Sequence, residues 1–175
     1  YTYLLENKEM VKGFFITHAH EDHIGALPYI LKDLNVPVYG SRLTLGILQG
    51  KLKEHRISDV KLREVNPRQT VNVGNFKIEF IRVTHSIPDS FAIAIHTPIG
   101  VILHISDFKI DMSPVDGQFM DLGRIAALGE QGVLLLLADS TNAEKEGYTP
   151  SETTVGDRLN KLFQNVEGRI ILTTF

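Results

Sequence analysis

The chain has 175 residues, of which 43% are hydrophobic and 22% charged, as in a globular domain and unlike a disordered segment. It contains no cysteine, which excludes disulfides and thiolate ligands, so a metal would need histidine, aspartate or glutamate. A formal charge of −3 excludes nucleic-acid binding through a generally positive surface, although a local groove could still bind RNA. No apolar run approaches the ~18 residues of a membrane span and no signal-peptide pattern is visible, so we expect a cytoplasmic protein without a membrane partner.

The first part of the chain predicts short strands alternating with helices. We expect a buried strand over 10–17, a helix over 24–31, a strand over 36–39 and a helix from Ser41 to about His55. Ser41 is a favourable N-cap, and Leu43, Ile47 and Leu52 are predicted to form the inner face of its helix.

From residue 60 the apolar residues recur with a period of two, which predicts strands separated by turns. These strands are expected over 60–65, 71–73 and 76–83, followed by a hairpin of 91–96 and 101–106 around Pro98-Ile99-Gly100.

The last part of the chain returns to alternating helices and strands. A helix is predicted over 121–131 with Leu122, Ile125, Ala126 and Leu128 facing inward. A strand buried on both faces is expected over 133–138, a helix capped by Ser151 to Gln164, and a last buried strand over 170–173. This order predicts an α/β fold in which sheets pack on each other with helices outside.

The strongest signal for function is the H-x-H-x-D-H cluster at residues 18–23, directly after the first predicted strand. In an extended chain His18 and His20 point to the same side, while Asp22 and His23 follow the turn and can face a second ion. Imidazole and carboxylate groups are the ligands that zinc-like cations prefer. A solvated, histidine-rich turn is the alternative, but four ligand-type residues at this spacing favour a metal site.

Two later residues extend this cluster. His85 follows a predicted strand, and although such a histidine is often structural, the first motif favours a role as a ligand. Asp107 ends an apolar strand and is expected to share one face with Val101, Leu103 and Ile105. A metal would remove the cost of burying this carboxylate, and its two oxygens could bridge two ions.

Together these residues resemble the ligand motifs of the metallo-β-lactamase fold. Three segments narrow the resemblance to the ribonuclease J family, in the β-CASP branch of that fold: T-H-A-H-E-D-H-I-G-A-L-P-Y at 17–29, T-H-S-I-P-D-S at 84–90 and A-D-S-T-N-A at 138–143. The resemblance implies a partial αββα sandwich of the metallo-β-lactamase type over 1–131 and the beginning of a β-CASP domain over 132–175.

The resemblance also implies roles for individual residues. His18, His20 and His85 would hold one Zn²⁺, Asp22 and His23 the second, and Asp107 would bridge them, with Mn²⁺ as another possible metal. Asp22, His23 and Asp107 would form the catalytic set, where a metal-bound hydroxide hydrolyses phosphodiester bonds of single-stranded RNA. The family acts as a 5′-to-3′ exonuclease and an endonuclease in rRNA processing and mRNA decay.

The remaining candidates each have a structural alternative. Asp139 would orient a metal-binding histidine or else cap a turn, and Ser86 and Ser90 would contact phosphate or else satisfy their own turn. We expect His96 and His104 to be structural, with His104 on the face opposite Asp107. His55 lies in a basic stretch interrupted by acidic residues, which is typical of a solvated surface and less so of an RNA-binding patch.

The sequence also departs from the family pattern. The family's N-terminal strand region and a further histidine ligand far downstream are missing, and 173–175 resembles the start of a phosphate-contacting loop. We therefore expect a fragment that is inactive alone. The resemblance further implies that the full-length protein forms homo-oligomers and has RNA-decay partners. Another hydrolase of this fold, acting on DNA, a thioester or a lactam, and a non-catalytic assembly subunit remain alternatives.

Overall fold

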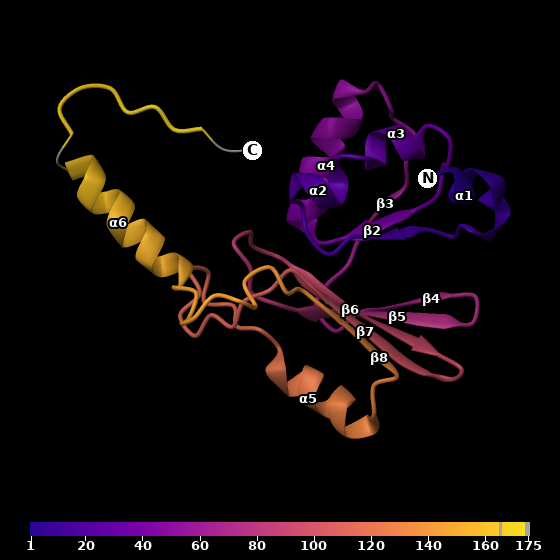
Figure 1. The fold of residues 1–175 in the computed structure, drawn as a ribbon. Helices are drawn as coiled ribbons and strands as arrows, with labels where there is room; N and C mark the ends of the chain where they lie inside the picture. The colour runs from indigo at the N-terminus through magenta and orange to yellow at the C-terminus, as the bar shows by residue number, and fades with distance from the viewer. Residues whose placement is uncertain (165, 174–175) are drawn as a thin grey trace.

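The computed structural model describes residues 1–164 and 166–173, in which two sheets lie between helices (Figure 1). The first sheet has three parallel strands, in the order β1 (Phe14–Phe15), β2 (Val38–Gly40) and β3 (Leu62–Glu64). The second has five strands in sequence order: β4 (Thr70–Val73), β5 (Phe76–Arg82), β6 (Phe91–Thr97), β7 (Gly100–Ser106) and β8 (Leu135–Ala138). Neighbouring strands of the second sheet are antiparallel except β7 and β8. The predicted α/β class and αββα layering are confirmed.

Helices cover the outer face of each sheet. Over the first sheet lie α2 (Glu21–Ile24), α3 (Leu27–Leu31) and α4 (Arg42–Glu54), while α1 (Thr2–Glu6) and a 3-10 turn (Lys8–Met10) precede β1. Below the second sheet lies α5 (Leu122–Gln131), and α6 (Glu152–Gln164) leads away from both sheets (Figure 1). The helix expected over 24–31 is thus two short helices, the first of which begins inside the H-x-H-x-D-H motif.

Three apolar clusters hold these layers together. One packs β1 and β2 against α2, α3 and α4, and another packs β5, β6 and β7 against α5. The third lies between the sheets, where Phe15 stacks on Tyr39 at a centroid distance of 4.9 Å and contacts Phe80. This inner cluster fixes one sheet on the other and therefore sets the distance between the strand ends of the two sheets.

The helix α4 begins as predicted but buries a different face. Ser41 Oγ accepts a hydrogen bond from the Thr44 backbone N–H at 3.3 Å, which confirms the N-cap. The buried face consists of Thr44, Leu45, Leu48 and Leu52. Ile47, expected inside, is exposed, because the buried stripe is displaced around the helix by about one residue from the predicted one.

The helix α5 is attached to the second sheet by charge as well as by apolar packing. Leu128 is fully buried, whereas Leu122 and Ala126, expected inside, are exposed. Arg124, on the same helix, donates to the buried carboxylate of Glu79 on β5, with Nε to Oε1 at 2.7 Å and Nη2 to Oε2 at 2.9 Å. This ion pair lies between α5 and the second sheet, where the apolar pattern of the helix predicted contacts between apolar side chains only.

Two predictions for the C-terminal part were wrong. The strand β8 was expected to be buried on both faces, but it lies at the edge of its sheet and all of its residues are exposed. Residues 170–173 form no strand and are also exposed. Burial of a strand requires side chains packed on both of its faces, and within the described residues neither face of β8 is covered enough to bury any of its residues. The predicted phosphate-contacting loop includes Thr174 and Phe175, which lie outside the described residues.

A small polar network attaches α6 to the second sheet. Asp111 is buried, and its Oδ2 accepts hydrogen bonds from Ser151 Oγ at 2.9 Å and from the Glu152 backbone N–H at 3.1 Å. Lys109 forms an ion pair with the Glu152 carboxylate. Ser151 Oγ also accepts from the Thr153 backbone N–H at 3.2 Å, which agrees with its predicted role as helix cap.

Candidate metal centre

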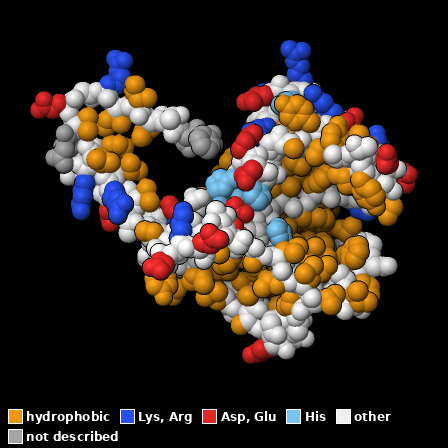
Figure 2. Space-filling model, in the orientation of Figure 1, with side chains coloured by type: hydrophobic (Ala, Val, Ile, Leu, Met, Phe, Trp, Pro, Cys, Tyr) orange, Lys and Arg blue, Asp and Glu red, His pale blue; other side chains and the backbone are white. Residues whose placement is uncertain are grey.

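The H-x-H-x-D-H segment lies where the two sheets meet. The Ile16 N–H donates to Tyr39 O at 2.8 Å in the first sheet, and Thr17 O accepts from the Phe91 N–H at 2.9 Å in the second. His18, the next residue, is therefore held between the sheets, and its side chain is 0% exposed. Figure 2 shows histidine side chains gathered at this junction with acidic side chains beside them.

Four predicted ligands converge at this junction, with one ligand atom from each of His18, His20, His85 and Asp107 lying within 4.8 Å of the others. His20 Nδ1 lies 3.1 Å from His18 Nε2 and 3.0 Å from His85 Nε2. Asp107 Oδ2 lies 3.9 Å from His18 Nε2 and 3.7 Å from His85 Nε2. Ring nitrogens and a carboxylate oxygen around one point form the donor set of a zinc-type site.

The pKa values of two of these imidazoles are lowered, which favours the neutral form that binds a metal. Burial, together with the neighbouring His23, His85 and His20, lowers the pKa of His18 to about 3. Burial and His20 also lower the pKa of His85, although Asp107 opposes this shift. Both rings are therefore neutral at pH 7, which is the form that binds a metal. The donors and their charge states fit a divalent cation.

Asp107 faces two groups of ligands. Its Oδ2 points toward His18 and His85, while its Oδ1 lies 3.5 Å from His23 Nε2. His23 Nε2 is in turn 3.6 Å from Asp22 Oδ2, and the Asp22 side chain is 79% exposed. The two oxygens of this carboxylate thus face different groups of candidate ligands.

The path by which Asp107 reaches the centre differs from the expected one. Leu103 and Ile105 are buried against α5, with Val101 packed beside them, and Asp107 was expected to continue their row. Ser106 instead has a φ of +63°, in the left-handed region, and the β7–β8 register shifts between His104 and Ser106. This break in the strand turns Asp107 away from α5 and toward the histidines.

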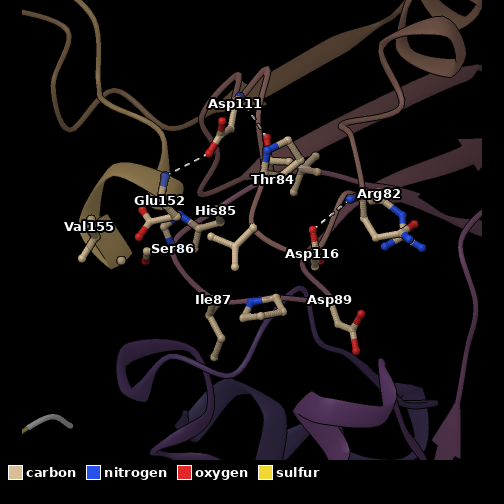
Figure 3. A pocket seen from close by; sticks show the side chains of 16 residues that line it. Arg82, Thr84, His85, Ser86, Ile87, Asp89, Asp111, Asp116, Glu152 and Val155 are labelled. Carbon is tan, nitrogen blue, oxygen red and sulfur yellow. Dashed lines mark hydrogen bonds between the residues drawn. The ribbon is translucent and has the colours of Figure 1, made fainter. Parts of the chain in front are cut away.

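A cavity of about 330 Å³ opens beside His85, between the 82–89 segment, the 111–118 loop and the start of α6 (Figure 3). Ser86 is exposed and lines this cavity, so its hydroxyl is available to a ligand. Ser90 is 1% exposed and donates to Ile87 O at 2.9 Å, which matches the alternative in which it satisfies its own turn.

Asp139 also adopts its structural alternative. Its Oδ1 accepts from the Thr141 backbone N–H at 3.0 Å and from Thr141 Oγ1 at 2.6 Å, as in a side-chain-capped turn. These hydrogen bonds lower the pKa of Asp139. No hydrogen bond joins it to a histidine in the part of the chain that the structure describes, although its charge raises the pKa of His85.

The other histidines have separate environments. His96 Nε2 lies 2.9 Å from Glu79 Oε2, a structural role, and His55 packs edge-on against Tyr29. Burial lowers the pKa of His104, His23 lowers it further, and Asp107 opposes this shift. Its buried Nδ1 has no hydrogen-bond partner among the described residues. Strand alternation predicted His104 on the face opposite Asp107. The left-handed Ser106 lies between these two residues and breaks that alternation.

Sequence patterns did not identify Thr17 or Ser106, although both hydroxyls lie at the centre. Ser106 Oγ donates to Thr17 Oγ1 at 2.9 Å, and Thr17 Oγ1 is 3.1 Å from His18 Nδ1. The only available signal was position, since each residue directly precedes a predicted ligand.

The chain is similar to curated proteins named ribonuclease J. Over 99% of its length the chain is 52% identical to ribonuclease J of Synechocystis sp., and it spans 28% of that protein. It is 49% identical to ribonuclease J of Helicobacter pylori and 42% identical to ribonuclease J2 of Bacillus subtilis, spanning 26% and 32% of them. The resemblance predicted from the three sequence segments is confirmed.

The fold is also found in a solved structure. A protein of unknown function from Enterococcus faecalis superposes with a TM-score of 0.63 at 20% identity, over 87% of this chain and 38% of that one.

None of the helices within 1–164 and 166–173 has the length and apolar character needed to cross a bilayer. The family described as "Beta-lactamase superfamily domain" matches residues 3–158. The chain therefore belongs to the β-lactamase superfamily.

Proposed function

We propose that this chain carries the metal centre of a hydrolase that cleaves phosphodiester bonds in single-stranded RNA. The observation that carries the proposal is the convergence of His18, His20, His85 and Asp107 within 4.8 Å. The relatives' name, ribonuclease J, supports RNA as the substrate. We assign 1–131 to the metal-binding domain and 132–175 to the start of a β-CASP domain, although β8 is hydrogen-bonded to β7.

In this proposal the chain's own groups hold and orient two ions. His18, His20 and His85 would supply ring nitrogens to one ion, and Asp22 and His23 lie on the other side of Asp107. When bound, such metals polarise a phosphate oxygen and lower the pKa of an attacking water. Asp107 would hold the two ion positions next to each other, because each of its oxygens faces a different group of ligands.

The charge of the centre suits an anionic substrate. The carboxylates that lie beside its histidines are those of Asp22 and Asp107. Two divalent cations would exceed the charge of these carboxylates, and the remaining positive charge would attract a phosphodiester. The Ser86 hydroxyl, beside His85 on the cavity wall, would donate to a phosphate oxygen, and Asp139 would act on His85 through its charge.

Finer features follow from the relationship with ribonuclease J. We propose Zn²⁺ as the metal, with Mn²⁺ able to occupy the same donors. We also propose combined 5′-to-3′ exonuclease and endonuclease activity, a cytoplasmic location, homo-oligomers of the full-length protein, and a role with partners in rRNA processing and mRNA decay.

The test compares substrates and metals with the full-length protein. Labelled 5′-monophosphorylated single-stranded RNA, single-stranded DNA and a thioester are incubated before and after removal of metal by a chelator and after return of Zn²⁺ or Mn²⁺. We expect RNA cleavage that the chelator abolishes and metal restores. Faster cleavage of DNA or of the thioester than of RNA would show that RNA is not the preferred substrate and would contradict the proposal.

Matched histidine variants connect the activity to the centre. His20→Ala removes a ligand whose Nδ1 faces two other imidazoles, and His55→Ala removes a histidine that contacts Tyr29 away from the centre. We expect His20→Ala to lose RNA cleavage and bound metal while His55→Ala keeps both. Full activity of His20→Ala, or a purified protein without metal by elemental analysis, would contradict the proposal.

A further inference from the structure

We propose that Thr17 is a positioning residue that fixes the tautomer of His18 before any metal binds. This inference rests on the proposed metal centre and assigns its preorganisation to one buried hydroxyl. Thr17 Oγ1 lies 3.1 Å from His18 Nδ1, while His18 Nε2 faces His20 Nδ1 at 3.1 Å. The two nitrogens of one ring thus have separate partners.

The chemistry of neutral imidazole then determines where the proton lies. A neutral ring carries one proton, and a nitrogen can bind a metal only through its lone pair. Since Nε2 faces the ligand cluster, the useful tautomer has its proton on Nδ1. That Nδ1–H donates to Thr17 Oγ1, which leaves the lone pair of Nε2 directed at the metal position.

A second contact orients the Thr17 hydroxyl. Ser106 Oγ donates to Thr17 Oγ1 at 2.9 Å, and the Thr17 and Ser106 residues are only 6% and 3% exposed. In the proposed tautomer Thr17 Oγ1 accepts from both His18 Nδ1–H and Ser106 Oγ–H, one through each lone pair, at a position that solvent does not reach. Because Ser106 ends β7 and directly precedes Asp107, one threonine hydroxyl connects the segment after β1 that carries His18 with the end of β7 that carries Asp107.

This arrangement is specific to one of the clustered histidines. Within the described residues, no hydrogen bond reaches His20 Nε2 or His85 Nδ1, the nitrogens that point away from the cluster. His18 is also the only fully buried ligand of the three, since the His85 side chain is 18% exposed and His20 is partly exposed. We infer that His18 is the preset ligand around which the other two adjust.

The first experiment needs no variant and no metal. Long-range ¹H–¹⁵N NMR of the metal-free protein reports which nitrogen of His18 carries the proton. We expect the Nδ1–H tautomer with slow exchange of that proton. A predominant Nε2–H tautomer would overturn the proposal, even if no variant could be purified.

The second experiment compares Thr17→Val, Thr17→Ser and Thr44→Val. Valine keeps the shape of threonine but accepts no hydrogen bond, serine keeps the acceptor, and Thr44 is an equally buried threonine that bonds Ser41 on α4. Zn²⁺ affinity is measured by competition with a chromogenic chelator, together with the His18 tautomer. We expect about 10- to 100-fold weaker binding for Thr17→Val, the magnitude typical of lost ligand-orienting contacts. Thr17→Ser and Thr44→Val should bind like the wild type.

The outcomes separate this inference from the proposed function. Wild-type affinity and tautomer in Thr17→Val would overturn the role of Thr17 while leaving the metal centre intact. A wild-type protein that binds no Zn²⁺ would contradict the proposed function, whereas the NMR result would still decide the hydrogen bond. Equal loss of affinity in Thr44→Val would show that general destabilisation is the cause and would also overturn the inference.

Discussion

Replacing Arg124 with Met should destabilise the protein by isolating a buried carboxylate. The Glu79 side chain is 6% exposed and receives both Arg124 hydrogen bonds, at 2.7 and 2.9 Å, with His96 as its other partner. Removing one member of a buried ion pair costs about 3–5 kcal/mol. The Arg124 side chain is 24% exposed and His96 remains, so we expect the lower end, about 3 kcal/mol.

The dependence on pH tests whether charge is the cause. Burial alone would raise the pKa of Glu79, but the hydrogen bonds from Arg124 and His96 outweigh it and lower the pKa below its ordinary 4.5. The contribution of Glu79 in the wild type is therefore complete above pH 4.5 and is lost as the pH falls through the lowered value. In Arg124→Met the opposing interaction is weaker, so Glu79 protonates at higher pH than in the wild type.

The assay is urea unfolding, followed by circular dichroism, at pH 7 and at steps down to pH 4. We expect the difference between wild type and Arg124→Met to be largest at pH 7 and to shrink toward pH 4 as Glu79 becomes neutral in the variant. The matched control is the double variant Glu79→Gln/Arg124→Met, which removes the isolated charge and should recover most of the loss. A deficit that stays constant with pH, or no recovery in the double variant, would refute the reasoning and indicate lost packing instead.

Three further changes give separate tests. Zn²⁺ at 100 times the wild-type Kd should stabilise the wild type by about 2.7 kcal/mol, or about 5–10 °C in thermal unfolding. At the same Zn²⁺ concentration, a shift of the same size in Asp107→Ala would contradict the bridging role. Ser41→Ala should cost about 1 kcal/mol in urea unfolding because the Thr44 N–H loses its cap, and an unchanged midpoint would count against that hydrogen bond. Asp111→Ala should release the N-terminus of α6, seen as faster limited proteolysis before Glu152, and unaltered cleavage would show that the helix is held by other contacts.

Much of the metal centre could be predicted from residue types alone. His18, His20, Asp22 and His23 are close in sequence, so placing one short segment brings all four near the same point. Asp107 could be predicted as well, because it follows a strongly apolar strand where an unpaired carboxylate would be costly. Local signals also predicted the Ser41 cap, since capping depends on neighbouring residues only.

The wrong predictions concern burial, which depends on partners from elsewhere in the chain. The face of α4 was misassigned because a buried threonine, Thr44, belongs to it in place of Ile47. The β8 run is apolar enough for a buried strand, yet the described residues do not cover its faces and all four of its residues are exposed. Apolar character shows that a segment prefers burial, but the packed sheets decide whether a surface exists to bury it.

Residue types and their order along the chain were therefore enough to name the candidate donors. How those donors meet depends on the packing of the two sheets. The inner apolar cluster brings the ends of two sheets together, and the left-handed Ser106 turns Asp107 toward the histidines. The hydroxyl of Thr17 faces His18 for the same reason, because its partner Ser106 lies in the other sheet and no local pattern encodes a contact across that distance.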